Sequence, residues 1–155
     1  MLFKMPGEQS VREQVLDICK KLFDGHICFT QNCEDEEYDF MPQGIPKAML
    51  IVEFDSCTRS LNKIRNGYNS NEIVRAWRYS NNSLEEIQID KEPKLSTDRH
   101  KNYDEVYARY AFSIEKKIVY LNVFYAPLSA SGYVFHILEK EGMLSLSEAE
   151  WEWLS

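Results

Sequence analysis

Cys57 is the residue whose type and position come closest to covalent chemistry. It follows the aliphatic run 48–54 and opens a short predicted helix that ends at Gly67. A thiol at the N-terminus of a helix has a lowered pKa and can act as a nucleophile. Arg59, Lys63 or Arg65 could then hold an anionic substrate. A small cysteine-dependent enzyme is therefore one interpretation of this segment.

The seven residues from Cys57 to Lys63 also resemble the phosphate-binding loop of cysteine phosphatases, in which five residues separate a Cys from an Arg. Here Lys63 stands at the Arg position, and lysine lacks the planar guanidinium that grips phosphate with two hydrogen bonds. No glycine lies between the two residues to let the loop close tightly. A small structural cysteine in a strand-to-helix turn explains the same pattern, so the sequence assigns no catalytic residue.

His26, Cys28 and Cys33 are the residues closest to a metal-binding pattern. Their spacing is His-x-Cys, then four residues, then Cys. A structural zinc site needs four ligands, and the sequence marks no fourth. Alternation also places His26 and Cys28 on one face of a short strand, as in an ordinary core. We therefore expect no metal and no cofactor.

The acidic segment 34–39 is the strongest candidate for a binding surface, because five of its six residues carry a carboxylate. It lacks the spaced oxygens and the glycine of a calcium loop. A like-charged run stays solvated, and carboxylates at an interface speed association with a basic partner. Exposed Tyr and Trp side chains are typical of interface hot spots. The predicted partner-binding residues are Glu34, Asp35, Glu36, Glu37, Tyr38, Asp39 and Trp153.

The charge balance supports this interpretation. The chain has 18 Lys and Arg against 25 Asp and Glu, a net charge of -7 and a pI of about 5.0. This balance disfavours a nucleic-acid partner, whose phosphates would be repelled on average. The window 56–79 is an exception, with five basic residues against one acid and a charge of +4. That window could hold an anion or pair with the chain's own acidic segment.

Helix signals are clearest at the two ends of the chain. Ser10 and Glu13 have the spacing of a capping box, and apolar residues follow at helical intervals, which predicts a helix over 11–24 that ends at Gly25. Near the C-terminus, the segment 147–150 has the same capping-box pattern and predicts a short helix that carries Trp151 and Leu154.

Strand signals dominate the rest of the chain. The run 48–54 is aliphatic and suits a central strand that is buried on both faces. The segment 70–90 fits either a helix turn or a hairpin that turns at Asn81 and Asn82, and periodicity does not separate the two. Alternating apolar residues predict a three-stranded antiparallel meander over 106–114, 118–125 and 132–138.

These elements predict a single domain over residues 1–155. The expected fold class is α+β, with a mostly antiparallel sheet that contains the C-terminal meander and is packed by the N-terminal helix and short additional helices. The start of the chain has no apolar segment of signal-peptide length, and no run could span a bilayer. The four cysteines form no C-x-x-C pair, so we expect a cytoplasmic protein with reduced thiols and no membrane partner.

Size, acidity and surface aromatics favour a non-enzymatic binding or inhibitor protein. In general character the chain resembles the small α+β immunity proteins that protect bacteria from their own polymorphic or contact-dependent toxins, although it shares no motif with any one of those families. The resemblance implies a basic protein partner, such as a toxin or nuclease domain, whose phosphate-binding surface the carboxylates would occupy. The alternatives are the cysteine-dependent enzyme at Cys57 and a homo-oligomeric structural subunit.

Overall fold

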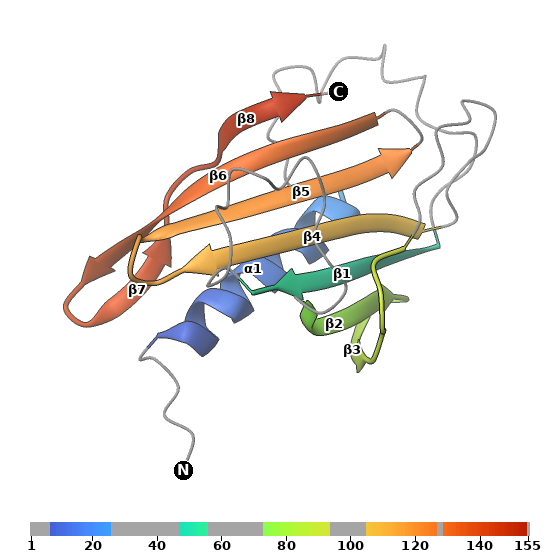
Figure 1. Cartoon of the computed structure of the whole chain (residues 1–155), viewed down its shortest axis with the longest axis horizontal. Coiled ribbons are helices and arrows are strands. Elements are labelled where there is room, and N and C mark those ends of the chain that lie inside the picture. Colours follow the sequence, from blue (N-terminus) through green and yellow to red (C-terminus); the bar gives the residue numbers. More distant parts are fainter. Residues whose placement is uncertain (1–6, 26–46, 56–72, 94–104, 127–128, 155) are drawn as a thin grey trace.

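The computed structural model describes residues 7–25, 47–55, 73–93, 105–126 and 129–154, and of 125–126, 129–130 and 151–154 it describes the backbone alone. In this part of the chain one helix accompanies a large sheet (Figure 1). The helix is α1 (Glu8–Phe23). The strands are β1 (Ala48–Phe54), β2 (Ile73–Ser80), β3 (Ser83–Ile87), β4 (Glu105–Ser113), β5 (Ile118–Ala126), β6 (Ser129–Lys140), β7 (Met143–Leu146) and β8 (Glu150–Leu154).

The strands form one mixed sheet in the order β3-β2-β1-β4-β5-β6-β7, with β8 also paired to β6. β1 pairs antiparallel with β2 and parallel with β4. The predicted fold class is therefore wrong, because the sheet is mixed and the described residues contain one helix rather than several. The predicted meander is present as β4, β5 and β6, but it forms only the middle of a larger sheet.

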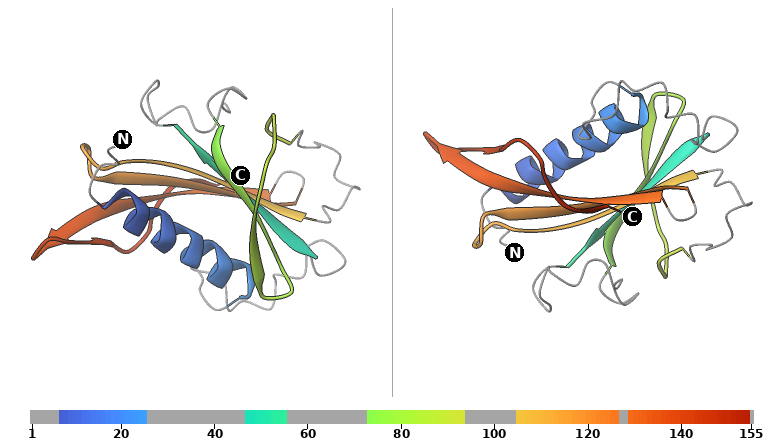
Figure 2. Two further views of the ribbon diagram at one scale, coloured as in Figure 1. Left: turned by 90° about the horizontal axis from the view of Figure 1, so that it is seen from below. Right: turned by 90° about the horizontal axis from the view of Figure 1, so that it is seen from above.

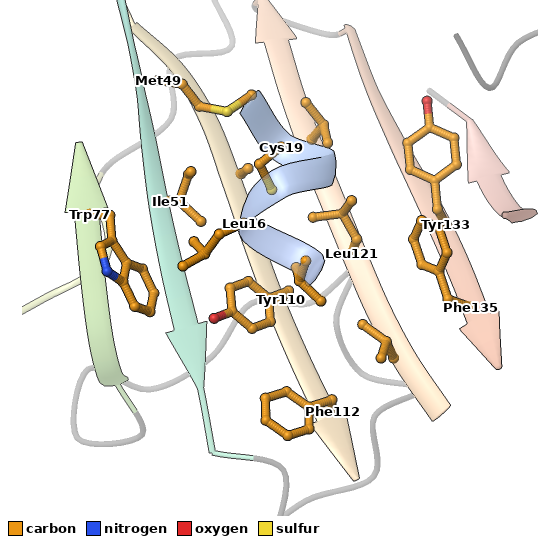
Figure 3. Packing of buried hydrophobic residues seen from close by; sticks show 14 of the residues in the cluster. Leu16, Cys19, Met49, Ile51, Trp77, Tyr110, Phe112, Leu121, Tyr133 and Phe135 are labelled. Carbon is orange, nitrogen blue, oxygen red and sulfur yellow. The ribbon is translucent and has the colours of Figure 1, made fainter. Parts of the chain in front are cut away.

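α1 covers one face of this twisted sheet (Figure 2). Its buried side chains include Val11, Val15 and Cys19, which meet inward residues of the central strands. Leu16 and Cys19 of α1 belong to the same core cluster as Ile51 of β1 and Leu121 of β5, and the helix is seen between these two side chains (Figure 3). Burial of such side chains is the main source of stability, at roughly 25 cal/mol for each Å² of apolar surface removed from water.

The predicted helix is confirmed, but its start is not where the capping box put it. The helix begins at Glu8, and Gly7 precedes it with a left-handed φ of 88° and no side-chain cap. Ser10 lies inside the helix, where its hydroxyl oxygen accepts a hydrogen bond from Gln14. The helix thus starts three residues before the predicted position. Arg12 stabilises this first turn, because its guanidinium donates to the side-chain oxygens of Glu8 and Gln9. Gly25 follows the helix with a φ of 77°, as predicted.

The segment 73–87, which the sequence left open, is a β-hairpin. Asn81 and Asn82 connect its strands with φ angles of 50° and 60°. Two consecutive left-handed residues make the type I′ turn that matches the twist of paired strands, and asparagine tolerates that conformation. The pattern of apolar residues fits a strand here because Trp77 and Tyr79 enter the core under α1.

The predicted C-terminal helix is wrong, because the segment from Glu150 to Leu154 is strand β8. The hydroxyl of Ser147, expected to cap that helix, instead accepts a hydrogen bond of 2.8 Å from the amide of His136. Ser147 also donates its own amide to the carbonyl of His136. The chain is thus held beside β6, and β8 pairs with the part of β6 that β7 leaves free.

The face of the sheet opposite α1 carries a second apolar cluster. Val52, Phe54 and Ala111 are each at most 2% exposed there. β1 is therefore buried along its whole length on both faces, as its aliphatic sequence predicts. Within the described ranges, no helix is long and apolar enough to cross a membrane.

Leu121 and Leu138 offer a matched test of this core. Leu121 is fully buried in β5, whereas Leu138 in β6 is 51% exposed. We expect Leu121→Ala to lower the free energy of unfolding by about 2–5 kcal/mol, because it removes buried methyl groups and leaves a cavity. Leu138→Ala should cost less than about 1 kcal/mol. Urea denaturation of both variants measures the difference, and equal losses would contradict the assigned burial.

Candidate functional site

A buried ion pair joins α1 to the centre of the sheet. Nε and Nη2 of Arg12 donate to the two carboxylate oxygens of Glu53 at 2.7 and 2.9 Å. The hydroxyl of Tyr110, the neighbour of Glu53 in the parallel register, donates to the same carboxylate at 2.6 Å. Arg12 and Glu53 are 3% and 4% exposed, so both charges are removed from water.

The pKa directions show that this cluster holds its protons firmly. The hydrogen bond to Glu53 raises the pKa of Arg12 above its already high value. Burial, and then the charge of Glu53, raises the pKa of Tyr110 well above its ordinary range. Around neutral pH the guanidinium and the phenol thus stay protonated. A closed pair without a proton to exchange is suited to positioning α1 rather than to acid–base catalysis.

A second polar cluster lies on the opposite face of the sheet, where Arg109 is 3% exposed. Its guanidinium forms an ion pair with Glu92, and its Nε donates to Asn122 Oδ1 at 3.0 Å. Tyr107 donates its hydroxyl to Glu92 at 2.7 Å. The guanidinium also lies 5.0 Å from the ring centre of Phe124, which adds a cation–π contact. Glu92 thus ties the segment after β3 to β4, and Arg109 extends the network to Asn122 of β5.

This second cluster contains one unsatisfied donor. Asn122 is fully buried, and its Nδ2 has no hydrogen-bond partner within the part of the chain that the structure describes. The bond from Arg109 fixes which amide atom is the oxygen, so Nδ2 is the orphan. Burial raises the pKa of the Tyr107 phenol, which therefore remains a donor. Both buried clusters are otherwise paired inside the fold.

An open surface groove of about 400 Å³ lies between α1 and the end of β7. Exposed carboxylates of Glu13 and Asp17 line it from the helix, with half-buried Ile18 beside them. Leu146 and Ser147 line it from the end of β7, and Ser10 and Gln14 complete the wall. The groove therefore combines negative charge with apolar contact area. We call it the α1–β7 groove.

Contacts within the α1–β7 groove leave its carboxylates accessible. Asp17 pairs with Lys21 at 2.9 Å, but both side chains are 51% exposed, so the pair contributes little. Glu13 accepts a hydrogen bond of 3.3 Å from Gln9 at the surface. Gln14 donates at 2.8 Å to the main-chain carbonyl of Leu144 and links the helix to β7.

Most residues predicted to bind a partner fall outside the described part of the chain. The acidic segment Glu34–Asp39 lies there, as do Cys57 and the metal candidates His26, Cys28 and Cys33. For Trp153 the structure gives the backbone, which lies in β8 opposite Gly132 of β6. Of the predicted partner-binding residues, the described part of the chain thus places only the backbone of Trp153.

Two basic residues of the window 56–79 can be placed, and each is paired. Arg75 binds Glu86 of β3, and Arg78 binds Glu105 of β4 at 2.7 Å. Glu86 lies on β3, the strand adjacent to β2, whereas β1 separates Arg78 in β2 from Glu105 in β4. This described part of the window thus forms ion pairs with other strands of the same sheet.

Sequence reasoning missed the buried charges and the α1–β7 groove. A usable signal was present for the former, since Arg12, Glu53 and Arg109 each occupy a position that the apolar pattern assigns to the interior. A charge in such a position is rarely fully buried unless it is paired. The groove leaves no comparable signal, because β7 and α1 are distant in the sequence.

We predict strong coupling between Arg12 and Glu53. Glu53→Gln should lower the free energy of unfolding by about 3–5 kcal/mol, because it removes the buried countercharge of Arg12 and leaves only the partly exposed Glu8 paired with the guanidinium. The double variant Arg12→Met, Glu53→Leu should recover much of that loss, since it removes both charges together. Tyr110→Phe, which deletes one hydrogen bond, is the control and should cost about 1–2 kcal/mol. The free energies of unfolding are measured with denaturant. A double variant that loses as much stability as Glu53→Gln would contradict the coupling.

The buried thiol of Cys19 gives a second prediction. Burial raises the pKa of Cys19 to about 12, so the thiolate that reacts with alkylating agents is absent at pH 8. We expect no iodoacetamide modification of Cys19 in the folded protein and full modification in guanidinium chloride, measured by peptide mass spectrometry. Modification of Cys19 under native conditions, at the rate found in denaturant, would disprove its burial.

No protein-family model, curated protein or solved structure matches this chain. The α1–β7 groove and the charge of the chain are thus the observations from which a function can be inferred.

Proposed function

We propose that this chain is an acidic, non-enzymatic binding protein that neutralises a basic protein, as a bacterial immunity protein neutralises a toxin. The observation that carries the proposal is the α1–β7 groove, where Glu13 and Asp17 flank the apolar Ile18. Two carboxylates beside apolar surface are suited to a lysine or arginine side chain, whose aliphatic stem packs while its charge pairs.

The net charge of -7 also supports the proposal, because its attraction acts over a longer range than contacts in the groove. An acidic protein attracts a basic partner before contact and raises the association rate, most strongly at low ionic strength. The acidic segment Glu34–Asp39 remains part of the proposed binding surface, together with Trp153. A cytoplasmic location also remains part of the proposal.

The function is tested by isolating a partner and measuring its kinetics. The tagged chain is used to capture proteins from a native lysate of the source cells, and the captured partner is purified. We expect a basic protein whose association rate falls at least about tenfold between 50 and 500 mM salt. Replacing the five acids of the 34–39 segment by lysine should lower the rate further. The single charge reversal Glu85→Lys, on the exposed edge strand β3, should change it little.

Two results would contradict the proposal. One is recovery of no basic protein from a lysate that contains the products of the neighbouring genes. The other is an association rate that is insensitive both to salt and to the charge reversals. If Cys57 instead reacts with iodoacetamide well below pH 8.5, the cysteine-dependent enzyme gains support. A dimer at micromolar concentration in sedimentation would favour the homo-oligomeric subunit.

A further inference from the structure

The outer edge of β7 presents main-chain groups to the α1–β7 groove. β6 and β7 pair antiparallel, with Ile137 opposite Leu146. The next pair is hydrogen-bonded, since the amide of Ser147 donates to the carbonyl of His136 at 2.8 Å. Hydrogen-bonded and non-hydrogen-bonded pairs alternate in such a ladder. The N–H and C=O of Leu146 therefore point away from β6.

Two further contacts support this assignment. The amide of Ile137 donates at 2.9 Å to Lys117, on the other side of β6, so it does not turn toward Leu146. Leu144, which has the same parity as Leu146, turns its carbonyl outward to accept the bond from Gln14. α1 thus caps the first outward residue of β7, and Leu146 follows at the point where the groove opens.

No strand pairs with this outer edge of β7 within the described residues. β8, the next strand in the chain, lies along residues 131–134 of β6 instead. An unpaired strand edge is a template on which another extended chain can add. Here the edge is short, and the helix α1 stands beside it with Glu13 and Asp17 directed into the same groove.

We propose that the α1–β7 groove binds a short extended segment of the partner by strand addition at Leu146. The main chain of the segment bonds to the N–H and C=O of Leu146. A lysine or arginine side chain reaches Glu13 and Asp17, and its stem packs on Ile18. This inference rests on the proposed function, because it names the part of the basic partner that is recognised.

The test uses short peptides and amide NMR spectra of the whole chain. The probe is acetyl-Ser-Val-Lys-Val-Ser-amide at low salt, and we expect its titration to shift the amide resonance of Leu146 and the side-chain amide of Gln14. A peptide with Glu in place of Lys should not bind. Among three peptides N-methylated at one central residue each, at least one should bind about fivefold more weakly, because one main-chain bond is lost.

Matched variants separate the groove from general electrostatics. Glu13→Gln with Asp17→Asn should weaken the lysine peptide roughly fivefold, since two surface ion pairs are removed. Glu85→Gln with Asp90→Asn changes the charge equally at exposed sites near the opposite edge of the sheet and should leave binding unchanged. Any one of three results would overturn the inference. They are equal binding of all the peptides, equal effects of both double variants, and an amide resonance of Leu146 that does not shift at millimolar peptide.

The outcome is distinguishable from that of the proposed function. If a basic partner is captured and the Glu13→Gln, Asp17→Asn variant binds it with unchanged affinity, strand addition in this groove is wrong and the binding function stands. If no basic partner exists, the proposed function fails. The peptide titration measures the groove itself in either case.

Discussion

The placement of Glu53 is the constraint from which much of this structure follows. β1 is buried along both faces, so a carboxylate within it must be neutralised inside the protein. Arg12 supplies that charge from α1 through two hydrogen bonds, and Tyr110 adds a third. A bidentate contact fixes both the rotation of the helix and its position along the sheet. The carboxylates of Glu13 and Asp17 are then held beside β7 as a consequence.

The two buried clusters together lock the register of β4. Tyr110 faces Glu53 under α1, while the preceding residue, Arg109, faces Glu92 on the other side of the sheet. A slip of one residue would exchange these side chains between the faces and leave several charges without partners. The apolar residues of β4 tolerate either face better than the charged ones do. Polar pairing thus specifies a register that apolar alternation alone would define weakly.

The sequence predicts what depends on neighbours in the chain. The helix over 11–24, the buried strand 48–54 and the meander strands follow from local periodicity, and all three are present. The C-terminal capping box failed because Ser147 bonds to β6, a contact that no local pattern encodes. The parallel pairing of β1 with β4 was not predicted, for the same reason. The α1–β7 groove combines both difficulties, since its walls are more than one hundred residues apart in the chain.

The proposed binding surface divides recognition into two physical steps. Net charge acts over the Debye length, about 8 Å at physiological salt, and so governs how fast a basic partner arrives. Main-chain bonds at Leu146 act only at contact and are not screened in the same way, so they govern how long the partner stays. The rigid edge of β7, fixed by Gln14 and by the packing of α1, needs little reorganisation to accept an added strand. Salt should therefore change association far more than dissociation.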